Sequence, residues 1–272
     1  LSALPEVDPS TKLHVANSIW PKAGFPVKQD FLQVNRKYFT AEVRALDFSK
    51  PEALKTINNW CAQNTNNLIK EPLDKISADA IMYLINAVYF KGVWAKKFNA
   101  KETTKANFYA EGGSTAKVDM MHQQETFGYQ SDEVAQYLDM PYGNKAFSMT
   151  VVLPHEGKTT DQVLGHLSSE NWNRVVSGLS SREVIVNLPK FKTKGKYELK
   201  EPLMRMGMVK AFTTAADLTG IADAALMISR VIHSTYCDVN EEGTEAAATT
   251  IVEAVFTSLP EIPTFNVNRP FI

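Results

Sequence analysis

The residue types that could carry enzyme chemistry are scattered along this sequence of 272 residues. There is no His-Glu-x-x-His pattern and no Cys-x-x-Cys pair, which are the usual marks of a metal site. The five histidines stand far apart, at His14, His122, His155, His166 and His233. Gly157 is followed by Lys-Thr-Thr, as at the end of a phosphate-binding loop, but Val152 stands where that motif needs its first glycine. A Gly-x-Ser-x-Gly nucleophile elbow is also absent. We therefore expect no catalytic residues, no metal, no cofactor and no enzyme activity.

A segment near the C-terminus has the composition of a peptide that is itself attacked. A strand running into Val239 is expected to turn at residues 240–243, where Gly243 supplies the permissive backbone dihedrals of a reversal. Small, β-tolerant residues follow, and no proline occurs between Gly243 and Leu259, so every backbone amide there could join a β-ladder. Small side chains on both faces would let such a strand enter a tight slot in a sheet. The pattern indicates a segment that is cut and then becomes a strand.

Taken alone, the Ala/Thr run has a second interpretation. Alanine is the best helix former, so residues 246–250 could equally be an ordinary surface loop or a short helix. Both interpretations stay open at this point.

Composition limits the class of protein. With 44% hydrophobic residues the chain can bury a large core, and no linker or repeat divides it, so a single domain over residues 1–272 is expected. The net charge of -1, from 29 basic and 30 acidic residues, gives no electrostatic footprint for nucleic acid or an anionic membrane. Cys61 and Cys237 both sit in apolar patterns and are expected to be buried free thiols. No apolar run approaches a membrane span, and the first five residues are not a secretory signal, so the sequence does not indicate a compartment.

Alternating and periodic apolar residues predict a mixture of strands and helices. Strands are expected at 13–20, 42–48, 80–90, 147–154, 183–191 and 227–239, and helices at 28–39, 159–167 and 197–206. The segment 80–90 is apolar apart from Asn86 and is expected to be buried on both faces. Capping boxes are expected at Ser49 with Glu52, ahead of a helix with Pro51 in its first turn, and at Thr159 with Gln162. Many non-local strands with helices between them favour an α+β fold with large antiparallel or mixed sheets.

Several blocks together resemble the serpin (serine protease inhibitor) superfamily. They occur in family order and span nearly the whole chain, at residues 86–94, 137–142, 188–191, 212–221, 228–233, 241–250 and 265–271. The resemblance implies the serpin fold, with large mixed or antiparallel sheets, surrounding helices and a mobile reactive-centre loop over about 241–263.

The resemblance also implies a suicide-type mechanism. A serine protease, and in some cases a cysteine protease, attacks one bond of the loop and forms an acyl-enzyme, and the freed hinge then inserts as a new strand in the main sheet. Counting from the hinge glycine by the family's spacing places the scissile bond at Thr257-Ser258, with Phe256-Thr257 as the alternative. The hinge residues so implied are Glu241, Glu242, Gly243, Thr244, Glu245, Ala246, Ala247, Ala248, Thr249 and Thr250.

Two further sites are carried over by the same resemblance. Asn86 and His233 correspond to the shutter, where buried hydrogen bonds hold the sheet closed, although His233 is equally compatible with a simple core histidine. Trp94, Lys190 and Glu241 correspond to the breach, where insertion begins. An ion pair between Lys190 and Glu241 is a hypothesis, and an unpaired surface glutamate is its alternative.

The chain also departs from the family pattern. The part of the fold that normally precedes Leu1 and the strand hairpin that normally follows Ile272 are not represented, so the chain is expected to be an incomplete serpin domain. Partners are expected to be elastase-, chymotrypsin- or subtilisin-like proteases rather than trypsin-like ones, because no Lys or Arg lies between Ile251 and Leu259. We expect a monomer capable of loop-sheet polymerisation, without nucleic acid or a membrane span, and the resemblance suggests an extracellular, periplasmic or cell-surface location. A non-inhibitory serpin acting in binding, storage or chaperoning is the alternative function.

Overall fold

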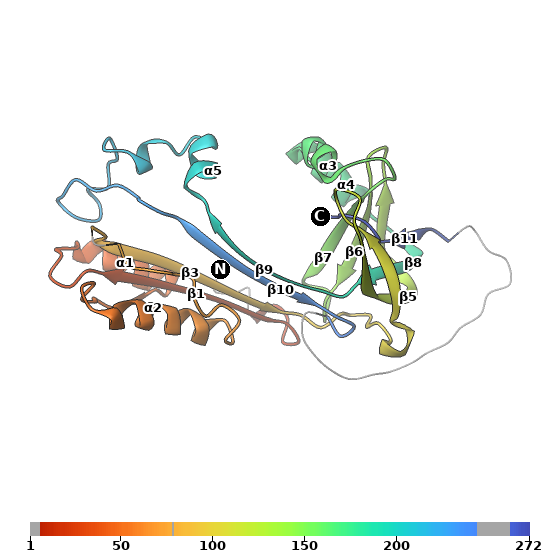
Figure 1. Cartoon of the computed structure of the whole chain (residues 1–272), viewed down its shortest axis with the longest axis horizontal. Coiled ribbons are helices and arrows are strands. Elements are labelled where there is room, and N and C mark those ends of the chain that lie inside the picture. The colour runs from red at the N-terminus through yellow and green to blue at the C-terminus, as the bar shows by residue number, and fades with distance from the viewer. Residues whose placement is uncertain (1–5, 78, 244–261) are drawn as a thin grey trace. The chain divides into compact units, whose positions relative to one another are not determined.

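The computed structural model describes residues 6–77, 79–243 and 262–272. The chain divides into two compact units (Figure 1). The first consists of Leu1–Lys12, Lys91–Lys192 and Asp238–Ile272, and the second of Leu13–Phe90 and Thr193–Cys237. Each unit is therefore assembled from segments that are distant in the sequence.

The first unit is built on a six-stranded sheet. Its strands are β4 (Thr104–Tyr109), β5 (Thr115–Ser131), β6 (Ala135–Pro141), β7 (Ser148–Pro154), β8 (Ser180–Pro189) and β11 (Thr264–Asn266). The order is β11-β8-β5-β6-β7, and β4 pairs with β5 off this path. The pairings are antiparallel except for β11 with β8, which is parallel. A single long strand, β5, therefore pairs with three others and holds the sheet together.

Two short helices pack on one face of this sheet, α3 (Thr160–His166) and α4 (Ser169–Gly178) (Figure 1). Val163 and Val175 are the buried residues of these helices, and they pack with Tyr137 and Val152 of the sheet. Helix α3 begins with the expected capping box of Thr159 and Gln162, in which each side chain satisfies a backbone amide of the other residue. A one-turn 3-10 helix, η2 (Ala100–Glu102), precedes β4.

The second unit contains a three-stranded sheet and most of a two-stranded one. Strands β1 (Lys12–Pro21), β2 (Glu42–Val43) and β3 (Met82–Lys91) are arranged in the order β2-β1-β3, and β9 (Phe191–Glu198) pairs with β10 (Ile232–Val239). Its helices are α1 (Gln29–Phe39), α2 (Pro51–Asn64), α5 (Lys200–Arg205) and the 3-10 helix η3 (Lys210–Phe212).

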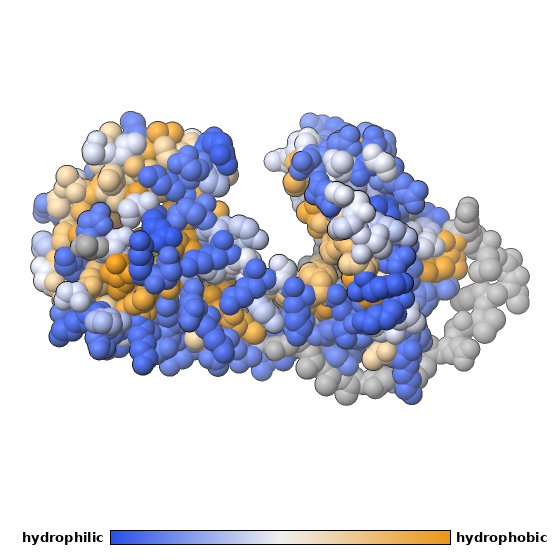
Figure 2. Space-filling model, viewed as in Figure 1, coloured by the Kyte–Doolittle hydropathy of each residue, from blue (hydrophilic) through white to orange (hydrophobic). Residues whose placement is uncertain are grey.

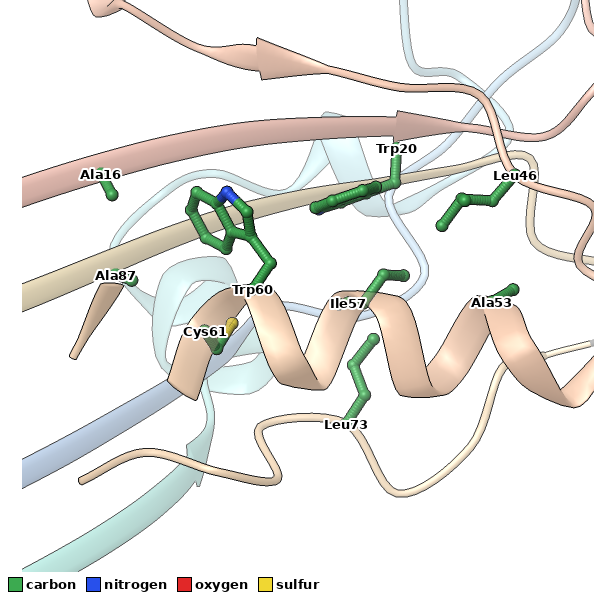
Figure 3. Close-up of a cluster of buried hydrophobic side chains, with 9 residues drawn as sticks. All are labelled: Ala16, Trp20, Leu46, Ala53, Ile57, Trp60, Cys61, Leu73 and Ala87. Atoms are coloured by element: carbon green, nitrogen blue, oxygen red, sulfur yellow. The ribbon is translucent and has the colours of Figure 1, made fainter. Parts of the chain in front are cut away.

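Helix α2 lies along one face of β1 and β3 and supplies the core of the second unit (Figure 3). Ile57 is completely buried, and Trp60 meets Trp20 of β1 edge to face, with ring centroids 6.0 Å apart. The indole Nε1 of Trp60 donates to Glu42 Oε2 at 2.8 Å, so the polar atom of this buried side chain has a hydrogen-bond partner. The amphipathic stripe of α2 therefore becomes a packed layer against the sheet.

The expected capping box at Ser49 is not formed. The N-cap is Lys50, which makes no side-chain cap, and Pro51 occupies the first helical position. The hydroxyl of Ser49 instead donates to Asp47 Oδ1 at 2.6 Å. The Ser49 hydroxyl, which the pattern predicted would cap the helix, is therefore bound by the carboxylate of Asp47.

Strand β3 was expected to be buried on both faces, and that expectation is wrong. Its side chains alternate, with Ala87 buried and with Leu84, Asn86 and Val88 exposed. Apolar surface is accordingly visible on the second unit (Figure 2). Of the two free cysteines, Cys61 is buried as expected, whereas Cys237 is only partly buried. Among the described residues, no helix is long and apolar enough to cross a membrane.

Candidate functional site

Strand β10 ends in a tight hairpin at Asn240–Gly243, in which the chain reverses direction. Asn240 and Gly243 exchange two backbone hydrogen bonds, Asn240 N to Gly243 O at 3.0 Å and Gly243 N to Asn240 O at 3.2 Å. Glu241 and Glu242 form the two-residue loop between them, and Asn240 Oδ1 accepts from Glu242 N at 3.0 Å. Gly243 is therefore paired in antiparallel orientation with Asn240, which directly follows β10.

Gly243 also forms an isolated antiparallel bridge to Val93, just after the end of β3. Its φ of 135° is in the region that favours glycine. A β-carbon there would overlap with Gly92 O and would lie 2.7 Å from Trp94 N. Two more backbone bonds fix the loop, from Trp94 N to Glu242 O and from Phe98 N to Glu241 O, both at 2.9 Å. The close approach of two backbones is the reason that only glycine fits this position.

Trp94 supports the hairpin from its side chain. It is 2% exposed, and its Nε1 donates to Asn240 O at 3.0 Å. The indole ring stacks on the ring of Tyr142, with centroids 4.5 Å apart and an interplanar angle of 9°. The rigid indole thereby links the hairpin to the end of β6.

The carboxylate of Glu241 is held by two partners. Lys190 Nζ lies 2.9 Å from Glu241 Oε2, and Thr103 Oγ1 donates to Glu241 Oε1 at 2.8 Å. Burial of the carboxyl group favours a higher pKa, but the hydrogen bonds from Lys190 and Thr103, with the charge of Lys190, hold the pKa of Glu241 below its ordinary value. The hypothesised pair between Lys190 and Glu241 is thus present, and Glu241 is ionised at neutral pH.

Further ion pairs surround the same hairpin. Lys97 Nζ lies 2.9 Å from Glu242 Oε2, and Lys192 Nζ lies 2.8 Å from Asp238 Oδ2. The acidic members are the more buried in each case. The hairpin is therefore anchored through its backbone, an indole and three carboxylates.

The breach residues implied by the sequence, Trp94, Lys190 and Glu241, are brought together in the first unit. Sequence reasoning missed Thr103 and Tyr142, although Tyr142 ends one of the blocks that carry the resemblance. No sequence spacing marks either residue as part of the site. A threonine hydroxyl or a tyrosine ring becomes a partner only when the fold places it beside the hairpin.

The shutter residues do not make the buried contact that was expected. Asn86 and His233 are both exposed, and no hydrogen bond within the described ranges joins their side chains. Asn86 Nδ2 instead donates to Asn17 Oδ1 at 2.9 Å, across β3 and β1. Exposure of alternate side chains of β3 leaves Asn86 on the uncovered face, which is why the expected burial fails.

The rest of the implied site lies outside the described residues. This applies to the hinge residues Thr244, Glu245, Ala246, Ala247, Ala248, Thr249 and Thr250 and to the reactive-centre residues Phe256, Thr257 and Ser258. In the part of the chain that the structure describes, no group of three or more His, Cys, Asp or Glu side chains could hold a metal ion.

Comparison with known proteins agrees with this geometry. The family model described as "Serpin (serine protease inhibitor)" matches residues 1–272. An uncharacterized serpin-like protein of Methanosarcina acetivorans is 39% identical over 252 residues, which are 91% of this chain and 59% of that protein. The leukocyte elastase inhibitor of Bos taurus is 38% identical, over 96% of this chain and 72% of its own length. The chain thus spans about three fifths of its archaeal relative.

Two solved structures share the fold. The thermophilic serpin tengpin in its native state superposes with a TM-score of 0.89 at 31% identity, over 99% of this chain and 71% of that chain. Human thyroxine-binding globulin complexed with thyroxine superposes with a TM-score of 0.88 at 28% identity, over 99% of this chain and 72% of that chain. With a family match along its whole length and the α+β fold of these structures, the chain belongs to the serpin family.

Proposed function

We propose that this protein is a suicide-type inhibitor of serine proteases, and of some cysteine proteases, that traps the acyl-enzyme by inserting its cleaved loop into a sheet. The observation that carries the proposal is the hairpin at Asn240–Gly243. The chain reverses direction there, and Gly243 bridges in antiparallel orientation both to Asn240 and to Val93, beyond the end of β3. A strand that continues from Gly243 would therefore begin in antiparallel register on both sides.

The sheet topology supports the same proposal. Strand β3 is an edge strand of the sheet β2-β1-β3. Strand β10 is paired only with β9, so its other edge is also without a partner strand among the described residues. An additional strand placed between β3 and β10 would join the two sheets and convert edge positions into paired ones. Inhibition is then driven by the hydrogen bonding and burial that the new strand gains.

The chemistry needs no catalytic group from this chain. The protease nucleophile attacks the carbonyl carbon of Thr257, the peptide bond to Ser258 breaks, and the amine of Ser258 leaves with the proton that the protease supplies. The ester remains on the protease while residues 244–257 insert. Fourteen residues at roughly 3.3 Å each would carry the tethered protease about 45 Å. Insertion must be faster than hydrolysis of the ester, and the small residues of the hinge favour that outcome.

The target class follows from the residues at the proposed bond. Thr257 suits proteases that accept small side chains, such as elastase- or subtilisin-like enzymes, and the alternative bond after Phe256 suits chymotrypsin-like enzymes. A relative is named leukocyte elastase inhibitor, which supports an elastase-like target.

A non-inhibitory binding protein is the second candidate. It is favoured by the similarity to thyroxine-binding globulin, whose structure is a complex with thyroxine. The hinge of the present chain argues against it, since Thr244 to Thr250 contain no proline and no bulky residue that would hinder insertion.

The test mixes the full-length protein with elastase-, chymotrypsin- and subtilisin-like proteases. Products are resolved on denaturing gels, and the released peptide is identified by mass spectrometry. We expect a complex that survives denaturation and a peptide that begins at Ser258. Cleavage without any stable complex across the panel would reject inhibition and favour the binding protein.

A further inference from the structure

A buried aspartate lies in the segment that precedes β1. Asp8 is 1% exposed, and its Oδ1 accepts from Ser10 N at 2.9 Å and from Ser10 Oγ at 2.7 Å. Its Oδ2 accepts from Thr11 Oγ1 at 2.9 Å and from Asn144 N at 3.2 Å. Oδ1 therefore closes a local turn, while Oδ2 also reaches a backbone amide 136 residues away.

Among the described residues, the same local turn also occurs at Asp47 and Asp217, without the long-range bond. Asp47 accepts from the amide and hydroxyl of Ser49, and Asp217 accepts from the amide and hydroxyl of Thr219. Both of these aspartates are exposed. The turn geometry by itself thus does not require burial, and the contact with Asn144 is what distinguishes Asp8.

The partner of Asp8 is the turn that joins β6 to β7. Asn144 returns a second bond, from its Nδ2 to Val7 O at 3.0 Å. Gly143, beside it, has a φ of 40°, and a β-carbon there would overlap with Ser10 Oγ and with Asp8 Oδ2. The side chains of Asp8 and Ser10 therefore lie directly against the backbone of this turn, at a position where only glycine leaves room for them. We call this contact the Asp8 clasp.

On its other side the same turn holds the backbone that pairs with the hinge. Gly143 N donates to Val93 O at 2.8 Å, and Ala95 N donates to Pro141 O at 2.9 Å. Val93 is the residue that bridges to Gly243. The chain of contacts thus runs from Asp8 through the turn to Val93 and on to Gly243, all within the first unit.

We propose that Asp8 is a positioning residue for the hinge: by clasping the β6–β7 turn it fixes the backbone of Val93, against which the inserting strand begins. This proposal rests on the proposed function for its consequence, since a hinge that is out of register would insert more slowly after cleavage. The acyl-enzyme would then hydrolyse more often, and more inhibitor would be consumed for each protease trapped.

The decisive measurement is amide hydrogen exchange on the full-length protein, read in peptides that contain Trp94 and Gly243. Asp8→Asn keeps one oxygen for the Ser10 turn but replaces the oxygen that accepts from Asn144 with an amide that cannot accept. We expect exchange at Trp94 and Gly243 to accelerate by about tenfold, as for the loss of one buried charged acceptor. Exchange in helix α2, in the second unit, should not change.

Asp47→Asn is the matched control, since it removes the same kind of carboxylate from the same kind of turn in the second unit, whereas the hinge begins in the first. It should leave exchange at Trp94 and Gly243 unchanged. If Asp8→Asn fails to fold, Ser10→Ala gives a milder test. It removes the hydroxyl oxygen that lies against Gly143 and the hydrogen bond from that hydroxyl to Asp8. Folded variants at Asp8 or Ser10 that leave hinge exchange unaltered would overturn the proposal.

A second measurement separates this proposal from the function. The number of inhibitor molecules consumed per protease trapped should rise by severalfold in Asp8→Asn, with little change in the rate of the first encounter. If the unmodified protein traps no protease, the proposed function fails, and the exchange experiment still decides whether the clasp positions the hinge.

Discussion

The backbone of Gly243 lies directly against the carbonyl oxygen of Gly92, so closely that the two chains leave no room for a β-carbon. The contact occurs where the chain has reversed after β10 and where Gly243 bridges to Val93 in antiparallel orientation. Under the proposed function, the stability of this hairpin and the insertion of the hinge would consequently depend on the same few atoms.

Gly243→Ala should destabilise the hairpin. The φ of 135° alone costs about 1–3 kcal/mol for a residue with a β-carbon, and the overlap with Gly92 adds to it. Urea denaturation would measure the loss. Gly24→Ala is the control, because Gly24 has a φ of 83° but no atom within 4 Å of its added β-carbon. Equal losses in the two variants would show that the contact with Gly92 does not matter.

Replacing Glu241 with Lys should promote polymerisation. The change removes the partner of Lys190 and places a second positive charge beside it, which should cost about 1–3 kcal/mol at this half-buried site. Monomer content after mild heating, measured by size-exclusion chromatography, should fall. The double variant that also carries Lys190→Glu restores opposite charges and should recover part of the monomer.

Glu125→Lys is the matched control for that experiment. It breaks the more exposed pair with Lys96, whose atoms lie 3.2 Å apart in the same unit, and such surface pairs contribute about 1 kcal/mol or less. Unchanged monomer content in Glu241→Lys would contradict the role of the pair.

The hinge should weaken in acid. Because the pKa of Glu241 is lowered in the folded protein, its ionised form contributes stability that is fully present above the unfolded pKa of about 4.5. That contribution is lost as the pH falls through the lower folded pKa. Melting temperatures of the protein and of Glu241→Gln should therefore differ at pH 6 and converge as the pH falls through the lowered pKa of the folded protein. A difference that stays constant over this range would mean that Glu241 is not the group responsible.

Changing the residue before the proposed scissile bond should change the target. Thr257→Arg supplies the side chain that trypsin-like proteases require, so a stable complex with trypsin should appear that the unmodified protein does not form. Phe256→Arg tests the alternative bond in the same way. A trypsin complex with the second variant only would move the reactive centre to Phe256-Thr257.

Part of this architecture could be predicted from the sequence. The α+β class and the serpin resemblance are confirmed, because alternating strands, a periodic helix and ordered blocks are local features. The pair of Lys190 and Glu241 could be anticipated only through the resemblance, since 51 residues separate them. The contributions of Thr103 and Tyr142 depend on tertiary proximity, which no spacing encodes.

Burial was the least predictable property. The apolar run in β3 suggested a strand covered on both faces, yet Leu84 is 59% exposed while its near neighbour Ala87 is buried. A run of apolar residues shows that both faces of a strand could be buried. Which face is buried depends on the elements that pack against it. The same argument explains why Asn86 is exposed and pairs with Asn17.

The position of Trp94 gives the hinge an optical signal of its own. The sequence has four tryptophans, and Trp20 and Trp60 lie together in the core of the second unit, while Trp172 lies on α4. With those three replaced by phenylalanine, all indole fluorescence would come from Trp94, whose Nε1 donates a hydrogen bond to Asn240 O. Opening of the hairpin would transfer this indole from a stacked, dry environment to water and shift its emission to the red. Opening of the hairpin could then be timed in solution, without a label and without a protease.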